Sequence, residues 1–147
     1  MKKILGLGFV ALLAASCTNN EPGTITVEAD GIESFTLFEI NTSSLDTLEV
    51  LKQQDGKFKT KVDVDTANFY VLRSEGNFAI PLLLEKGDAP VIKVEGTDDS
   101  NRNYTVTGSA GSEQIKKITD ITRDAMEELN ELDSLSRVYM ADSTIDM

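Results

Sequence analysis

LEVLKQQDGKFKTKVDV, residues 48–64, carries the pattern that decides the fold. In its second half, apolar or β-branched residues alternate with charged ones from Phe58 to Val64. This period of two is typical of a strand with one face in a core and the other in water. Asp55 and Gly56 supply the two positive φ angles of a type I′ turn. The two halves of the stretch are therefore predicted to pair as an antiparallel hairpin.

Similar strand patterns lie on both sides of this stretch. They are TITVEA (24–29), SFTLFEI (34–40), NFYVLRS (68–74), FAIPLLLE (78–85), VIKVEG (91–96) and NYTVTG (103–108). Turn-forming residues separate them, and no helical periodicity intervenes. Residues 24–107 are thus predicted to form a mainly β domain, an antiparallel β-sandwich or small barrel of seven or eight short strands. Pro81 predicts an edge strand or a bulge at its position.

The alternation also predicts which side chains fill the core. They are Ile25, Val27, Phe35, Leu37, Leu48, Val50, Phe58, Val62, Val64, Phe69, Val71, Ile80, Leu82, Leu84, Ile92, Val94 and Val106. Two strands carry large side chains on their second face as well, namely Phe38, Ile40, Tyr70 and Leu72. We expect a C-terminal helix to cover that second face, because a sheet buried on both sides has apolar residues on both.

A single long amphipathic helix is predicted over residues 112–140, within a helical segment 108–147. Its apolar residues recur every three or four positions: Ile115, Ile118, Ile121, Ala125, Leu129, Leu132, Leu135 and Val138. Ser112 is the predicted N-cap, with Glu113 in the first turn. A helix of this length reaches about 43 Å, which is longer than a sandwich is wide. Its distal half should therefore contact a second copy, a separate protein partner or a following domain.

The N-terminus has the pattern of a secretory signal peptide over residues 1–16. Lys2 and Lys3 precede an apolar run that is too short to span a bilayer. Small residues then precede Cys17, the only cysteine, in an arrangement that resembles the bacterial lipobox. This resemblance implies that Cys17 carries a lipid and attaches the chain to a membrane. Residues 17–23, polar and containing Pro22 and Gly23, are predicted to be a short lipidated tether.

Charge and composition exclude several classes of function. The formal charge of −11 becomes −13 when residues 1–16 are removed, since they contain two lysines and no acid. An acidic chain without a basic stripe does not fit nucleic-acid binding. There is no histidine and no second cysteine, so histidine-based triads, His or Cys metal sites and redox cysteine pairs are excluded. We therefore expect no catalytic residues, no metal and no cofactor, and a protein that is not an enzyme.

The order of these elements resembles a known family. DGKFKTKVDV, NFYVLRS, LLLEKGDAPVIKVEG and YTVTGSAGSEQIKKI, in that order behind a lipobox, are similar to the N-terminal domain of unknown function of Bacteroidetes-type envelope lipoproteins. In that family the domain usually precedes a thioredoxin-like thiol-disulfide oxidoreductase domain with a WCxxC-type motif. No such motif occurs here. The resemblance implies a β-sandwich in the cell envelope and a helix that leads toward a second domain.

Two hypotheses of function follow. In the first, the protein is a lipid-anchored, non-catalytic β-sandwich module on the periplasmic side or at the outer membrane, and helix 112–140 binds a protein partner or a second copy. In the second, it is the N-terminal part of a thioredoxin-like lipoprotein whose catalytic domain has been lost. An enzyme acting on its own is a third possibility, which the missing histidine and thiol argue against.

Overall fold

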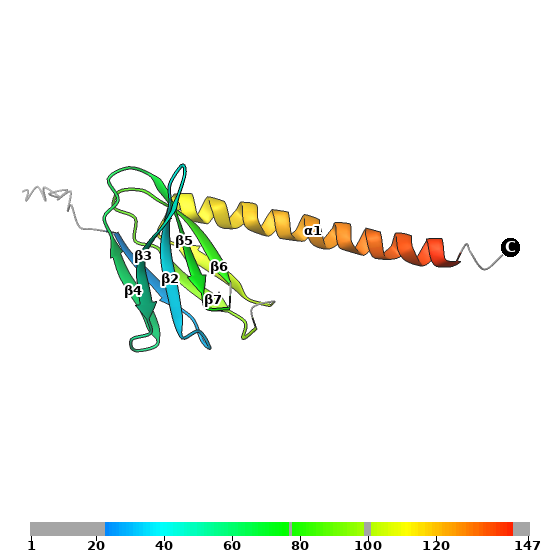
Figure 1. Cartoon of the computed structure of the whole chain (residues 1–147), viewed down its shortest axis with the longest axis horizontal. Coiled ribbons are helices and arrows are strands. Elements are labelled where there is room, and N and C mark those ends of the chain that lie inside the picture. The colour runs from blue at the N-terminus through cyan, green and yellow to red at the C-terminus, as the bar shows by residue number, and fades with distance from the viewer. Residues whose placement is uncertain (1–22, 77, 99–100, 143–147) are drawn as a thin grey trace, which may run out of the picture.

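The computed structural model describes residues 23–76, 78–98 and 101–142 (Figure 1). Its elements are β1 (Gly23–Glu28), β2 (Ser34–Ile40), β3 (Leu45–Lys52), β4 (Lys57–Val62), β5 (Asn68–Ser74), β6 (Ala79–Leu84), β7 (Val91–Glu95), β8 (Asn103–Thr107) and α1 (Ala110–Asp142). Two four-stranded sheets have the orders β4-β1-β7-β8 and β3-β2-β5-β6. Pairing is antiparallel except between β1 and β7. The predicted fold class, a mainly antiparallel sandwich followed by one long helix, is confirmed.

The predicted hairpin between β3 and β4 is wrong in its pairing. The tight turn is present, with φ of 51° at Asp55 and 77° at Gly56. However, a single backbone bridge, from Gln54 just after β3 to Lys57 of β4, joins the two segments, and each strand belongs to a different sheet. A full hairpin would have kept both apolar faces in one layer. Because the strands separate, the inner residues of β4 and Leu51 of β3 are buried from opposite layers of the core.

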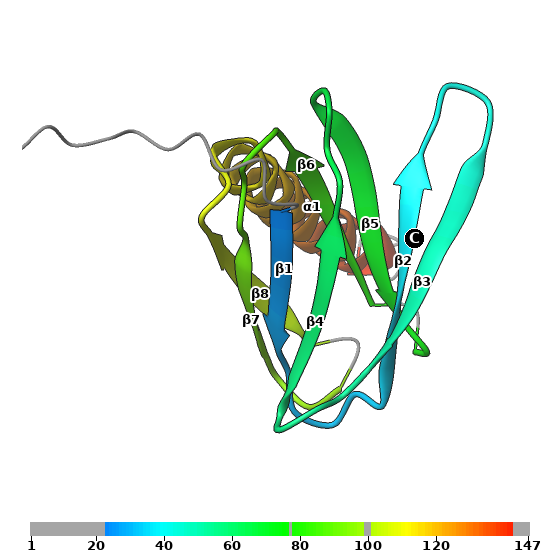
Figure 2. The same ribbon diagram turned by 90° about the vertical axis from the view of Figure 1, so that its left-hand side faces the viewer.

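The core lies between the two sheets (Figure 2). Most of the predicted members are buried there: Ile25, Val27, Phe35, Leu37, Phe58, Val62, Val64, Ile80, Leu82, Leu84, Ile92 and Val106, with Val94 partly buried. Val71 is also buried, but on the outer face of β5 opposite Phe38, so its predicted place in the core is wrong. Leu48, Val50 and Phe69 are corrections, since they are 45%, 54% and 50% exposed. Tyr70 and Leu72, predicted on the opposite face, are buried in the core instead. Leu51, Ala29, Ile32 and Tyr104 also belong to the core and were not predicted.

Strand register explains the reversed face of β5. Leu72 lies opposite Leu37, which points inward, whereas Phe69 lies opposite Ile40, which is 41% exposed. Paired residues share a face of the sheet, and a shift of one residue moves every side chain to the other face. Because NFYVLRS is apolar on both faces, its alternation alone does not identify the inner one.

Helix α1 does not cover the second face of β2 and β5, which corrects the expectation from the sequence. It packs mainly on β6 and β8, and most of its length projects beyond the sandwich (Figure 1). The outer side chains Phe38 and Ile40 therefore stay partly or largely exposed. Arg73 covers part of this face, with its guanidinium carbon 5.7 Å from the centre of the Phe38 ring. The edge position of β6, predicted from Pro81, is confirmed.

Candidate functional site

Two buried serines fix the start of α1 to the free edge of β6. Ser112 accepts a hydrogen bond from the Leu83 N–H at 3.2 Å, and its hydroxyl lies 3.0 Å from the Leu83 carbonyl oxygen, to which it donates. Ser109 donates to Asp88 Oδ2 at 2.7 Å and accepts from the Ser112 N–H at 3.3 Å. The serines thus satisfy backbone groups that an edge strand leaves unpaired. They also fix where the helix leaves the sandwich.

Ser109, rather than the predicted Ser112, is the N-cap. Its side chain accepts the N–H of Ser112, and its carbonyl oxygen accepts the first helical hydrogen bond from Glu113 at 3.0 Å. The Glu113 carboxylate in turn accepts the N–H of Gly108 at 3.1 Å. Residue preference alone does not decide which of two serines three positions apart is the N-cap. Both lie within hydrogen-bond distance of the Leu83 carbonyl oxygen at the edge of β6.

Replacing Ser112 with alanine should destabilise the protein by about 1–3 kcal/mol, because the N–H of Leu83 then loses its acceptor in a partly buried position. The comparison is Ser136→Ala on the exposed part of the helix, which should change stability little. Urea unfolding followed by circular dichroism measures both. Equal stability of the two variants would contradict the proposed role of Ser112.

The first four turns of α1 rest on the sandwich through polar side chains. Lys116, 8% exposed, places its ammonium 4.9 Å from the centre of the Tyr104 ring and also pairs with Asp120. Arg123 bonds to Asp120 at 3.1 Å and reaches Asn103 at 3.4 Å. The hydrogen bond from Lys116 lowers the pKa of Asp120, against the opposing effect of burial. Burial raises the pKa of Tyr104 to about 12, so its phenol stays neutral beneath the helix.

Most apolar residues of α1 lie on the side of the helix that faces away from the sandwich, and only Ile115 at the start is half-buried. We call Ile115, Ile118, Ile121, Ala125, Leu129, Leu132 and Leu135 the apolar stripe. At about 100° per residue, Ile118 and Ile121 point nearly opposite to Lys116 and Arg123. They are 63% and 69% exposed although they lie beside the sandwich, and the leucines beyond them are exposed to a similar degree. The helix thus rests on its polar side and presents its apolar side to solvent.

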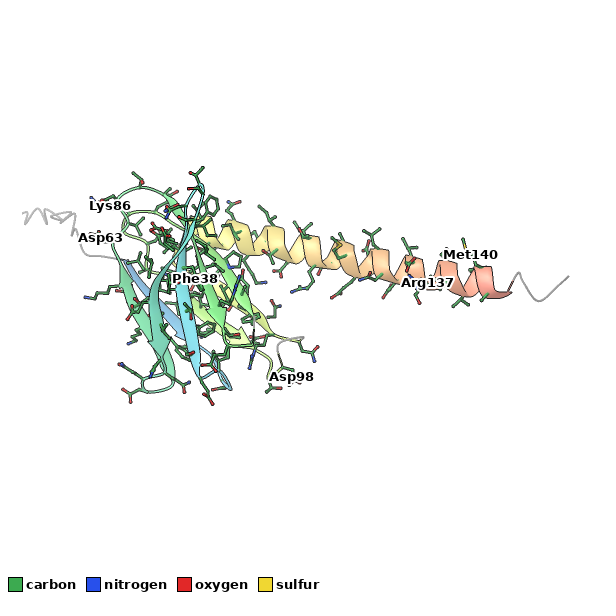
Figure 3. The ribbon with its side chains drawn as sticks, viewed as in Figure 1. Phe38, Asp63, Lys86, Asp98, Arg137 and Met140 are labelled. Carbon is green, nitrogen blue, oxygen red and sulfur yellow. The ribbon has the colours of Figure 1, made fainter. Side chains whose placement is uncertain are left out.

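Between Asp124 and Ala141 the helix has no contact with the sandwich that buries a side chain. We call residues 124–142 the helical arm. Figure 3 shows its side chains, Arg137 and Met140 among them, projecting from a helix that extends past the strands. Tertiary packing of an apolar face normally stabilises helices in proteins. An exposed apolar face of this length is typical of an interaction surface.

The predicted site residues have different outcomes. Cys17 and residues 1–16 lie outside the described residues. The predicted helix 112–140 is present as Ala110–Asp142, and its apolar residues from Ile118 onward are exposed. The polar contact face was missed. Its signal was in the sequence, because Ser112, Lys116, Asp120 and Arg123 also recur at intervals of four and three.

A shallow groove between β3 and β4, of about 280 Å³, is a weaker candidate. Two acids on its walls already have partners: Glu39 accepts from Asn68 at 2.8 Å, and Glu49 accepts from Thr60. Among residues 23–76, 78–98 and 101–142, no three acidic, His or Cys side chains gather as metal ligands would. In the same part of the chain, α1 lacks the apolar length needed to cross a membrane. The exposed apolar surface of α1 is therefore a stronger candidate for a functional site than this groove.

The fold and this surface define a class of protein: a two-sheet β-sandwich that carries an exposed amphipathic helix. The chain belongs to the DUF4369 family, a domain of unknown function, which matches residues 23–115. The match covers the whole sandwich and ends just after the serine-held start of α1. No curated protein matches the chain. The rest of α1 therefore extends beyond the family domain.

Proposed function

We propose that the protein is a lipid-anchored, non-catalytic module of the cell envelope, on the periplasmic side or at the outer membrane, whose sandwich holds the helical arm toward a protein partner. Support for the anchor comes from the signal-peptide pattern and from the small residues before Cys17. Support for a binding role comes from one observation above all: α1 packs on the sandwich with its polar side and leaves the apolar stripe exposed from Ile118 onward.

The non-catalytic part of the proposal rests on the side chains that the chain offers. It has no histidine, and lipidation would convert its only thiol, at Cys17, into a thioether. Three acids line the β3–β4 groove. Glu39 and Glu49 accept hydrogen bonds from Asn68 and Thr60, and Asp63 is exposed to solvent. These partners account for both carboxylates as parts of the sandwich structure.

The start of β1, which would follow the lipidated tether, lies at the same end of the sandwich as the start of α1. Thr26 of β1 donates its N–H to the Pro90 carbonyl oxygen at 2.9 Å, and Ala89 donates to the Gly108 carbonyl oxygen at 3.1 Å. The segment 88–90 thus connects β1 to the start of α1, and both begin at the same end of the sandwich (Figure 2). A lipid on Cys17, six residues before Gly23, would keep that end within about 20 Å of the membrane. The start of the helix would then lie near the membrane as well.

Replacing Cys17 with alanine should move the protein completely from the membrane fraction to the soluble fraction. The same variant should lose all label from radioactive palmitate, since Cys17 is the only cysteine. Ser16→Ala is the matched control, because a small residue before the cysteine is kept, and it should remain anchored and labelled. A labelled or membrane-bound Cys17→Ala protein would contradict the anchor.

The alternative function is that of an N-terminal domain from a thioredoxin-like thiol-disulfide oxidoreductase lipoprotein. The extension of α1 past the family match at residue 115 favours it, because a following domain could pack on the apolar stripe. The genomic sequence downstream of codon 147 separates the two. A CxxC-encoding segment there, in frame or shifted, would favour the oxidoreductase origin, and an intergenic region would favour the independent module.

A further inference from the structure

The apolar stripe has a symmetric spacing along the helix. Ile115, Ile118 and Ile121 stand ten, seven and four residues before Ala125, and Leu135, Leu132 and Leu129 stand ten, seven and four residues after it. Ala125, the smallest member, lies at the centre. A symmetric dimer brings the same surface of both copies together, so that residue i meets j and j meets i. The stripe has this property when two copies run antiparallel.

We propose that a second copy of this chain covers the apolar stripe, as an antiparallel helix pair whose two-fold axis passes beside Ala125. In that pair Ile118 meets Leu132 of the other copy, and Ile121 meets Leu129. The small side chain of Ala125 lets the two helices approach at the centre, and larger side chains fill the space on either side. The contact from Ile115 to Leu135 extends over about 30 Å. This inference deepens the proposed binding role of the helix and is independent of the lipid on Cys17.

The sandwich does not obstruct this arrangement. It contacts this part of α1 through Lys116 and Arg123, on the side opposite Ile118 and Ile121. Ile118 and Ile121 are already exposed next to it. A second helix can therefore lie along the stripe from Ile118 onward, with Ile115 half-buried at its end and the two sandwiches at opposite ends of the pair.

Charge favours the antiparallel direction. The helical arm has a formal charge of −5, whereas residues 110–123 have +1, and antiparallel pairing places one segment beside the other. Lys117 and Glu131 lie on the same side of the stripe, so each Lys117 comes close to Glu131 of the other copy. A parallel pair would instead bring Glu131 near Asp133 of the other copy. Asp124 and Glu128 of both copies crowd near the axis and oppose the pairing, so Glu128→Gln should strengthen it.

A membrane surface fits the stripe less well. Helices that lie in the interface usually have Lys and Arg beside their apolar face, and these are attracted to anionic headgroups. The helical arm has six acids and one arginine. Its charge therefore opposes binding to an anionic bilayer.

Cysteine cross-linking in cells that express the full chain tests both pairing and direction. Ala125→Cys should form a disulfide-linked dimer, because the two copies meet there. Leu132→Cys alone should not, since its two copies would stand about 21 Å apart along the axis, beyond the reach of a disulfide. Co-expressed Ile118→Cys and Leu132→Cys chains should cross-link. Leu132→Cys that cross-links with itself would show a parallel pair, and Ala125→Cys that stays monomeric would show no pair; either result overturns the proposal.

The cross-linking is done with Cys17 present and again in a Cys17→Ala background. A dimer in both, with loss of anchoring only in the second, supports both the lipid anchor and the pairing. A dimer in a Cys17→Ala chain that remains membrane-bound would refute the anchor and keep the pairing. An anchored wild-type chain with no cross-link at Ala125→Cys would refute the pairing and keep the anchor.

Solution mass provides the matched-variant test. The purified full-length protein, 16.0 kDa per chain before processing, should sediment as two chains. Leu129→Asp should weaken the dimer about a hundredfold or more, because each dimer loses two buried leucines. Asn130→Asp adds the same charge one residue away on the polar side and should leave the dimer nearly unchanged. Equal effects of the two variants, or a wild-type monomer that binds anionic vesicles instead, would overturn the proposal.

Discussion

Replacement of Phe58 with alanine is expected to lower the free energy of unfolding by about 3–5 kcal/mol. Phe58 is fully buried on β4, and its ring meets that of Phe35 on β2 edge to face, with centres 5.0 Å apart and planes at 89°. The two rings belong to different sheets, so this contact joins the layers at the edge where β3 and β4 separate. A domain of this size is typically stable by only 5–15 kcal/mol, and the variant should lose much of that margin.

Phe69→Ala is the control for this prediction. It removes the same side chain from the outer face of β5, where Phe69 is half exposed, and should cost far less. Urea or thermal unfolding measures the two free energies. If Phe58→Ala were no less stable than Phe69→Ala, the contact between the sheets at Phe58 would not be as described.

Replacement of Gly108 with alanine should destabilise the protein by about 3 kcal/mol or more, from two causes that act together. Gly108 has φ of +83°, a conformation that residues with a side chain rarely adopt. An added Cβ would also stand 2.5 Å from the Ala89 carbonyl oxygen, which is backbone and has little freedom to move. The strain falls on the segment that leads from β8 into the helix, so the fixed start of α1 should loosen as well.

Gly87→Ala separates the two causes. Gly87 has a similar φ of +89°, but an added Cβ there meets nothing within 4 Å. It should cost only the backbone strain, about 1–2 kcal/mol. Denaturant unfolding of both variants gives the difference, which measures the close approach of Gly108 to Ala89. Equal losses would mean that the chain relaxes freely at Gly108.

For α1, the periodicity of apolar residues predicts the span of the helix but not which side of it contacts the sandwich. Its existence and approximate span follow from apolar residues at intervals of three and four, and α1 begins and ends within two residues of the predicted 112–140. Its orientation does not follow, because an apolar stripe is normally assumed to face the domain that carries it. Here the contact surface is the polar side with Lys116 and Arg123. The order Ser112, Lys116, Asp120, Arg123 was visible in the sequence, but nothing local identifies it as the buried side.

For the strands too, some buried faces follow from the sequence pattern and others do not. Alternation identified the inner face of β4 through Phe58 and Val62, because its other face is charged. It did not identify the inner face of β5, where both faces are apolar, and it assigned Val50 of β3 to the core although that residue faces outward. The turn at Asp55 and Gly56 was predicted from residue type alone, since its backbone angles are a local property.

By itself, the sequence determined the elements: the strand segments, the tight turn, most of the core and one long amphipathic helix. These follow from periodicity and from residue preferences that act over a few positions. Only the tertiary structure decided that β3 and β4 separate into different sheets, which face of β5 is buried, and that α1 rests on its polar side. These three features depend on which segments, distant in the sequence, pack against one another. The free energy gained by burying their apolar side chains is a property of the whole domain.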